Sequence, residues 1–457
     1  MQWFQIVVRT RIPLLAIVLS LVAVGCTPGG AVRQVSAPSA PASTGVTETG
    51  PVSLTVWDQE SGATSRVWDQ LTQEFEAKYP NVTVNRVHEN LDELKTLLKL
   101  ALSGPNAPDI VEANQGWPEM GSLVKAGLLL PLDNYATAYG WRDRVPQNVL
   151  AVSSWTPDGK NFGTGNLYGY TAMGELIGVY YNKQKLADLG LSVPTTFDEF
   201  QRDLEVAKQA GQIPIQFADN DAWPGIHELG VVQGQIDSKD YMTNFVFGTQ
   251  KDQVSFATPE NVQAATTLQN WANAGYFTPG FLGAGYDSSL VDYVKGEGVF
   301  MITGNWAVAN LGAKSDQFGF FLLPPQTAGA PPVSMGGAGY PLAISSSTDH
   351  ADTAAAYIDW MNSDHASELL VQTGQLPLST TSSGSNVQAG TLLAEVLTAA
   401  KSIATANGVV PYEDWATPTF YDTITAAIQE LLANRLTPQQ FVDKVQADYS
   451  DFQSSRS

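Results

Sequence analysis

The chain has 457 residues, of which 44% are hydrophobic and 15% charged. This composition provides enough apolar material for a large folded core and excludes a wholly disordered protein. Its 24 Lys and Arg against 45 Asp and Glu give a formal net charge of −21, so nucleic acid and anionic membrane surfaces are poor partners. One cysteine and four scattered histidines exclude an internal disulfide and predict no metal site, and no cofactor motif is present.

Residues 1–25 predict a secretory signal peptide. An apolar run of 13 residues, Ile12–Val24, follows two arginines and is too short to span a bilayer. The segment Leu21–Cys26 resembles a bacterial lipobox, with Ala23 where the pattern prefers Leu. We therefore expect Cys26 to be lipidated and to become the first residue of the mature protein.

Residues 26–51 are rich in Pro, Ser, Thr, Ala and Gly and contain almost no large apolar side chain. Such a segment cannot offset the entropy of folding, so it predicts a flexible tether. The folded part should then begin near Val52.

The first elements after the tether alternate between strands and helices. The apolar patterns predict strands at 52–56, 82–87 and 109–111. Between them they predict a helix with its apolar stripe at Val67, Leu71 and Phe75 that Pro80 ends, and a second helix over 91–102. This βαβαβ order predicts a mostly parallel sheet covered by helices, with ligand groups in the loops after the strands. The loops Trp57–Glu60 and Glu112–Trp117 are of this kind.

Further along, three helix starts carry clear signals: the capping boxes 196–199 and 437–440, and Thr258 followed by Pro259. Residues 299–302 predict a buried strand. The last 100 residues predict mostly helices.

Several segments, in this order, resemble one known family. They are Leu54–Trp57, Pro108–Val111, Ala126–Asp133, Tyr168–Tyr170 leading to Glu175, Val179–Lys183, Pro194–Phe197, Lys295–Glu297, Phe300–Trp306 and Gly336–Ile344. Their order resembles that of the extracellular solute-binding proteins of bacterial ABC importers, of the maltose-binding-protein type. The resemblance covers about residues 52–450.

The resemblance implies an α/β, periplasmic-binding-protein-like fold of two lobes. Each lobe would be a mostly parallel sheet flanked by helices, with a multi-strand hinge and a ligand cleft between the lobes. The implied N-terminal lobe is residues 52–172 and 301–337, and the implied C-terminal lobe is 173–300 and 338–457.

A sugar site needs aromatic platforms for C–H patches, and amides and carboxylates for hydroxyls. The resemblance places Glu175 just beyond the hinge as an acceptor of sugar hydroxyls, and Trp306 after the buried strand as a stacking platform. The other candidates lie in loops or glycine-rich segments. They are Trp57, Asp58, Gln59, Asn114, Gln115, Trp117, Trp223, Gly337, Tyr340 and Trp415.

No motif predicts catalytic residues, so the chain is interpreted as a binding protein and not an enzyme. The expected function is capture of a neutral mono- or oligosaccharide by a lipid-anchored monomer on the outer side of the cell membrane, for delivery to the transmembrane subunits of an importer. Two alternatives stay open: a phosphorylated polyol or other solute as the ligand, or a lipoprotein glycosidase or lyase.

Overall fold

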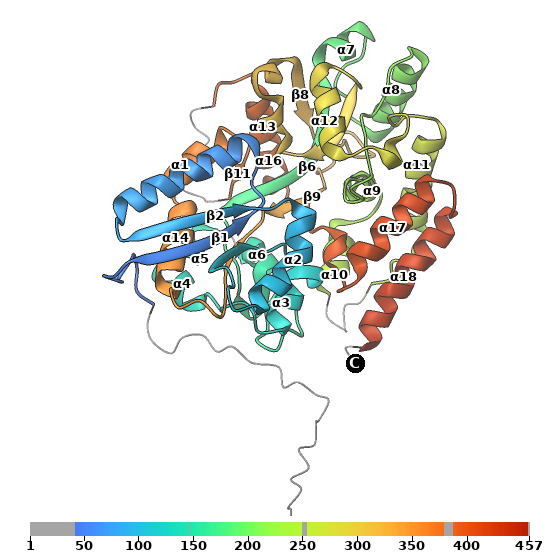
Figure 1. The fold of residues 1–457 in the computed structure, drawn as a ribbon. Helices are drawn as coiled ribbons and strands as arrows, with labels where there is room; N and C mark the ends of the chain where they lie inside the picture. Colours follow the sequence, from blue (N-terminus) through green and yellow to red (C-terminus); the bar gives the residue numbers. More distant parts are fainter. Residues whose placement is uncertain (1–41, 146, 249–253, 379–386, 456–457) are drawn as a thin grey trace, which may run out of the picture. The chain divides into compact units, whose positions relative to one another are not determined.

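The computed structural model describes residues 42–145, 147–248, 254–378 and 387–455, and contains two main sheets (Figure 1). The first sheet has the strand order β10 (Leu342–Ile344), β3 (Ile110–Glu112), β1 (Val52–Asp58), β2 (Val82–His88). Strand β1 is parallel to both β2 and β3, whereas β10 is antiparallel to β3. The predicted βαβαβ unit is therefore confirmed.

Helices cover both faces of this sheet. Leu54 of β1 shares a core with Leu71 of α1 (Gly62–Lys78) and Tyr357 of α14 (Ala351–Met361). On the opposite face, Val111 of β3 shares a core with Leu98 of α2 (Leu91–Ser103). Figure 1 shows α1 and α2 on opposite sides of the β1 and β2 ribbons. Helix α15 (Asp364–Val371) follows α14.

Among the described residues, eight short elements lie along the chain between β3 of the first sheet and β6 of the second. They are η1 (Trp117–Gly121), α3 (Ser122–Lys125), α4 (Asp133–Ala138), α5 (Trp141–Arg144), α6 (Gln147–Leu150), η2 (Ala151–Ser153), β4 (Ser154–Trp155) and β5 (Asn166–Leu167).

The second sheet is built on one long strand, β6 (Met173–Asn182). It pairs with β7 (Phe300–Gly304), β8 (Phe318–Phe321), β9 (Ser334–Ala338) and β11 (Leu376–Pro377), in every case antiparallel. Strand β12 (Val409–Val410) is parallel to β9. The expectation of a mostly parallel sheet is therefore wrong for this half, because the strands that meet β6 return to it in the opposite direction.

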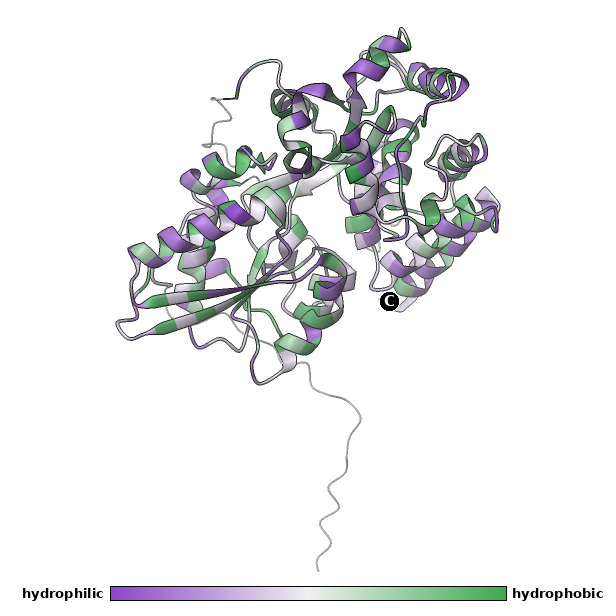
Figure 2. Cartoon of the chain, turned by 45° about the horizontal axis from the view of Figure 1, so that its top comes forward, coloured by the Kyte–Doolittle hydropathy of each residue, from purple (hydrophilic) through white to green (hydrophobic). Residues whose placement is uncertain are grey.

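Helices surround the second sheet, and α9 (Pro224–Ile236) is buried from Pro224 to Gln235. Elsewhere in Figure 2, helices carry both green and purple residues, as expected where one face packs and the other meets solvent. The remaining helical elements are α7 (Lys183–Asp188), α8 (Phe197–Gln209), α10 (Lys239–Phe247), α11 (Pro259–Asn273), η3 (Phe281–Gly283), α12 (Tyr286–Lys295), α13 (Ala307–Leu311), η4 (Gly312–Gln317), α16 (Leu392–Thr405), η6 (Glu413–Trp415), α17 (Phe420–Leu432) and α18 (Pro438–Ser455).

The strand partners do not agree with one part of the expected lobe division. Residues 301–337 were expected with the first lobe, but they contribute β7, β8 and β9, which all pair with β6. Conversely, β10 and α14 lie beyond residue 338 and pack with β3 and α1. The pairing favours a first lobe of 52–172 and 340–371, with the described residues of 173–339 and 372–455 in the second.

The last part of the expected tether packs on the folded body. The Gly45 amide donates a hydrogen bond to the Tyr139 hydroxyl at 2.8 Å, and the Glu48 carboxylate meets the His350 ring nitrogen at 2.8 Å. These contacts anchor the chain before β1. The predicted signal peptide and Cys26 lie outside the described residues. Among the helices that the structure describes, none is long and apolar enough to cross a membrane.

Candidate ligand-binding site

A cavity of about 610 Å³ lies among loops and elements that pack with both sheets. This is within the size range of small-molecule sites. Its walls come from the loops after β1 and β3, the start of β6, and residues in or just before α9, α12, α13 and α17. The side chains used below are Gln59, Glu60, Lys95, Glu112, Asn114, Tyr170, Glu175, Asp221, Trp223, His227, Tyr286, Trp306, Tyr340, Tyr412, Asp414 and Trp415.

Five rings form what we call the aromatic wall: Trp223, His227, Tyr286, Trp306 and Tyr412. The ring centroids of Trp223 and Tyr286 are 4.5 Å apart, and those of Trp223 and Trp306 are 6.2 Å apart. The His227 ring lies 5.6 Å from Trp306 and 5.8 Å from Tyr412. These contacts connect α9, α12, α13 and the segment before η6, so the rings hold one another in position.

Local chain geometry fixes the two tryptophans of the wall. The Trp306 indole lies directly over Gly304, where an added Cβ would come within 2.0 Å of the ring, and its Nε1 donates to the Tyr286 hydroxyl at 2.9 Å. Before Trp223, Ala222 has a φ of 67°, which is unusual for a residue with a side chain. Such a conformation is found where the chain must place a particular side chain.

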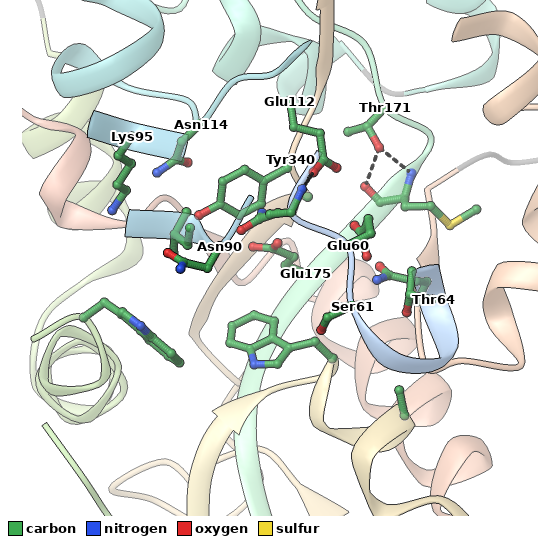
Figure 3. Close-up of a pocket in the computed structure, with 18 of the residues that line it drawn as sticks. Glu60, Ser61, Thr64, Asn90, Lys95, Glu112, Asn114, Thr171, Glu175 and Tyr340 are labelled. Carbon is green, nitrogen blue, oxygen red and sulfur yellow. Dashed lines mark hydrogen bonds between the residues drawn. The ribbon is translucent and has the colours of Figure 1, made fainter. Parts of the chain in front are cut away.

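Three carboxyl groups face the cavity from elements of both sheets: Glu60 after β1, Glu112 in β3 and Glu175 in β6. Figure 3 shows them gathered near Tyr340. The Glu112 Oε2 accepts a hydrogen bond from the backbone N–H of Gln59 at 2.8 Å, and the Glu175 Oε2 accepts one from the Tyr412 hydroxyl at 3.3 Å.

The pKa values of these three groups are all raised, chiefly because burial disfavours their charged forms. The pKa of Glu60 rises to about 7, with the nearby Asp58 charge adding to the effect of burial. The pKa of Glu175 rises to about 8, although the hydrogen bond from Tyr412 opposes the shift. The pKa of Glu112 is raised well above its usual range by burial and by Glu60.

Neutral polar groups complete the site. Gln59 and Asn114 line it from the ends of β1 and β3. The backbone N–H of Asn114 donates a hydrogen bond to Glu119 Oε1 at 2.7 Å, which fixes the loop after β3. Figure 3 shows Asn114 and Lys95 on one side of Tyr340 and Thr171 on the other. Aromatic faces, amides and carboxyls together suit a ligand that has both apolar faces and hydroxyl groups.

The structure brings seven of the predicted site residues to this one cavity. They are Gln59, Asn114, Glu175, Trp223, Trp306, Tyr340 and Trp415. Trp415 is buried, and the backbone of Gly116 lies against it, with an added Cβ at 2.5 Å from the Trp415 Cβ. Contact of these residues with a ligand stays a prediction.

Five other predicted residues do not line the cavity, and the structure gives them other roles. Asp58 is fully buried and pairs with Arg86 at 2.7 Å. Trp57 is half-buried and packs against the core. The Gln115 side chain donates to the carbonyls of Ala338 and Gly339, at 3.1 and 2.6 Å.

The remaining two of these five, Trp117 and Gly337, also have structural roles. The Trp117 ring packs against Trp155 and Phe452, with centroids 4.6 and 4.9 Å away. Gly337 lies opposite Glu175 in the pairing of β9 with β6, and its φ of 128° favours glycine. It therefore shapes the strand behind Glu175.

Sequence reasoning missed several residues of the cavity. Glu60 and Glu112 belong to the two loops that the sequence analysis named as carrying ligand groups. The position of these loops at strand ends was therefore enough to find both residues. His227, Tyr286 and Tyr412 lie on or beside helices far apart in the chain, and no local pattern connects them.

Comparison with known proteins agrees with this architecture. The chain is 22% identical to a solved structure named chitin oligosaccharide binding protein, with a TM-score of 0.75 over 88% of this chain and 99% of that one. It is 23% identical to the multiple sugar-binding protein of Streptococcus mutans serotype c, over 65% of this chain and 68% of the relative. It is 22% identical to the maltotriose-binding protein of Pyrococcus abyssi, over 72% of this chain and 67% of the relative.

The structural match confirms the predicted two-lobed α/β fold. A family model described as bacterial extracellular solute-binding protein matches residues 61–368. Because that match covers well over half of the chain, the protein belongs to the bacterial extracellular solute-binding protein family.

Proposed function

We propose that this protein captures a mono- or oligosaccharide and delivers it to the permease of an ABC importer, while held at the membrane by a lipid on Cys26. The observation that carries the proposal is the cavity in which Trp223 and Trp306 stand beside Glu175 and Asn114. Sugar C–H faces pack on aromatic rings, and sugar hydroxyls pair with carboxyl and amide groups. The printed names of the relatives as sugar-binding proteins support the same ligand class.

The charge of the cavity argues against the phosphorylated alternative. Among the described residues that line it, Lys95 is the one Lys or Arg side chain, whereas Glu60, Glu112, Glu175, Asp221 and Asp414 all contribute carboxyls. A phosphate needs convergent cationic donors, and burying it beside carboxylates is unfavourable. The ligand therefore carries no anionic group.

Delivery would follow from binding between two lobes. Gln59 and Asn114 follow strands of the first sheet, whereas Trp306 and Glu175 belong to elements of the second. A ligand that contacts both groups binds a closed arrangement better than an open one, and so shifts the population toward closure. The importer would recognise the closed form.

The test is a thermal-shift screen over neutral and amino mono- and oligosaccharides, followed by isothermal titration of each sugar that stabilises the protein. Trp306→Ala should weaken binding by about tenfold to a hundredfold, because a preformed apolar platform is lost. Trp360→Ala is the matched control, since this half-buried indole donates to the Leu71 carbonyl outside the cavity. Wild-type affinity in a folded Trp306→Ala protein would contradict the proposed platform.

The proposed absence of catalysis has a separate test. Each bound oligosaccharide should be recovered intact after prolonged incubation, as judged by chromatography and mass spectrometry. Turnover that is lost in Glu60→Gln or Glu175→Gln would instead support the glycosidase alternative.

The proposed anchor is tested in cells. Cys26→Ser should abolish incorporation of a labelled fatty acid and release the protein from the detergent phase. Unchanged partitioning of this variant would contradict lipidation at Cys26.

A further inference from the structure

The three carboxyls of the cavity have no cationic partner. Within the part of the chain that the structure describes, neither Glu60, Glu112 nor Glu175 takes part in an ion pair. They nevertheless lie on one cavity and near one another around Tyr340 (Figure 3). The site thus gathers three carboxyl groups that form no ion pair with the described residues.

The nearest cations are already engaged elsewhere. The Arg86 guanidinium binds Asp58 with two hydrogen bonds, of 2.9 and 2.7 Å, and also meets Asp69 at 2.6 Å. The Lys95 ammonium lies over the Tyr421 ring, 3.7 Å from its centroid. Arg86 therefore opposes the rise in the Glu60 and Glu112 pKa values only from a distance, and neither cation forms an ion pair with the three glutamates.

Burial also makes these glutamates hold protons that a bound cation would release. The pKa values of Glu60 and Glu175 are raised to about 7 and about 8, mainly by burial. At neutral pH an empty cavity therefore retains protons on part of this group. A cation placed among the carboxyls favours their charged forms and lowers their pKa values.

A second, independent feature of the cavity is a buried ring nitrogen that the described residues leave unpaired. The His227 side chain lines the cavity, is 6% exposed, and its Nδ1 has no hydrogen-bond partner among the described residues. Burial lowers the pKa of His227 to about 3, so the ring is neutral. Beside it, Trp306 and Tyr412 offer ring faces, and aromatic faces attract ammonium groups.

We propose that the sugar bound in this cavity carries a basic amino group, whose ammonium is held among Glu60, Glu112 and Glu175. This inference rests on the proposed function and narrows its ligand class from neutral sugars to amino sugars. Buried carboxylates without a cation are costly, whereas the same groups around an ammonium form charge-assisted hydrogen bonds. The ligand would thus supply the positive charge that the protein lacks at this point.

Other groups also set the potential of the cavity. The titratable or charged side chains that line it besides the three glutamates and the tyrosines are His88, Lys95, Asp221, His227, Asp287 and Asp414. Asp58 raises and Arg86 lowers the pKa of Glu60 through space. The expected pH dependence of binding is therefore assigned by variants of the glutamates and not by the profile alone.

The experiment is isothermal titration with matched pairs of sugars that differ in the amine. Suitable pairs are D-glucosamine with D-glucose, D-galactosamine with D-galactose, and the β-1,4-linked glucosamine trimer with cellotriose, with the N-acetylated trimer as a neutral analogue. In at least one pair the amino sugar should bind about tenfold to a hundredfold more tightly at neutral pH. Its binding should release protons, measured in two buffers of different ionisation heat, and should weaken toward pH 5.

Glu112→Gln and Glu60→Gln each keep the side-chain volume and remove one carboxylate. Each should reduce the ratio of amino-sugar to parent-sugar affinity and the number of protons released, whereas the control Glu368→Gln, an exposed residue of α15, should change neither. If neutral members bind as well as amino members in every pair that binds, or if only other, neutral sugars bind, the amino-sugar inference is overturned and sugar capture stands. If no sugar binds the folded protein, the proposed function fails as well.

Discussion

The carboxylate of Asp58 shows how one residue at a strand end can be structural while its neighbour faces the ligand cavity. Asp58 is fully buried, and the Arg86 guanidinium from the adjacent strand β2 binds both of its oxygens. The Arg86 side chain is itself only 9% exposed. Gln59, one residue later, lines the cavity.

We expect Asp58→Asn to lower the free energy of unfolding by about 3 to 5 kcal/mol, because it leaves the Arg86 charge buried without its principal partner. Chemical denaturation with an unchanged slope would measure this loss. Asp69→Asn is the matched control: Asp69 meets the same guanidinium but is 59% exposed, so its loss should cost no more than about 1 kcal/mol. Equal effects of the two variants would contradict the role assigned to Asp58.

The sequence was informative about these positions only in part. A strand followed by polar residues identified the loop with Gln59 and Glu60, because strand ends are a local signal. It did not reveal that Arg86 lies beside Asp58, because that contact depends on the register in which β1 and β2 pair. Local patterns give the region of a site, while long-range pairing decides which of its side chains are free to face a ligand.

Among the elements, helix α18 illustrates a start that is fixed by its own residues. The backbone N–H of Gln440 donates to the Thr437 hydroxyl oxygen at 3.3 Å, and the backbone N–H of Thr437 donates to the side-chain Oε1 of Gln440 at 2.9 Å. This is the reciprocal capping box that the sequence predicted. The same holds for Thr196 and Thr258, whose side chains accept hydrogen bonds from residues three positions later.

We expect Thr437→Ala to reduce the free energy of unfolding by about 1 kcal/mol, because an orphan amide at the start of α18 loses its acceptor. Thr437→Ser keeps the hydroxyl and should change stability by less than half as much. Urea denaturation of the three proteins measures both values. A loss in the serine variant as large as that in the alanine variant would show that the cap is not the cause.

Strand pairing in the second sheet could not be predicted in the same way. The partners of β6 begin at residues 300, 318, 334 and 376, so each pairing closes a loop of more than a hundred residues. The hydrophobic periodicity and the capping residues of a segment are local signals, so they do not identify a strand partner more than a hundred residues away. For this reason the elements themselves were largely predicted, whereas the antiparallel arrangement and the lobe that receives residues 301–337 were not.

At the scale of the whole molecule, several buried acidic groups form no ion pair with the described residues, unlike Asp58. Burial raises the pKa of Asp219 and of Glu413 to about 8, as it does for Glu175 in the cavity. Glu228 on the buried helix α9 has a pKa raised well above its usual range, mainly by burial, and neither of its carboxyl oxygens has a hydrogen-bond partner among the described residues. These groups bind protons more tightly in the folded chain than in the unfolded one.

The folded state therefore holds more protons than the unfolded state between about pH 5 and pH 8, and unfolding releases them. It follows that the free energy of unfolding is highest near pH 5 and falls as the pH rises through the folded pKa values. The net charge of −21 acts in the same direction, because its repulsion grows as further carboxyls ionise. We expect the melting temperature to fall by about 5 °C or more between about pH 5.5 and pH 8.5.

Glu413→Gln assigns this effect to a particular group. Glu413 is 1% exposed and lies outside the residues that line the cavity, so the variant removes one buried titration without changing the proposed binding groups. Its melting temperature should depend less steeply on pH above about pH 6 than that of the original protein, whereas Glu368→Gln should keep the original slope. Differential scanning calorimetry of the three proteins without ligand, over the same pH series, provides the comparison. A stability that rises toward pH 8.5 would contradict the raised pKa values of the buried carboxyls, and an unchanged slope in Glu413→Gln would contradict the part assigned to Glu413.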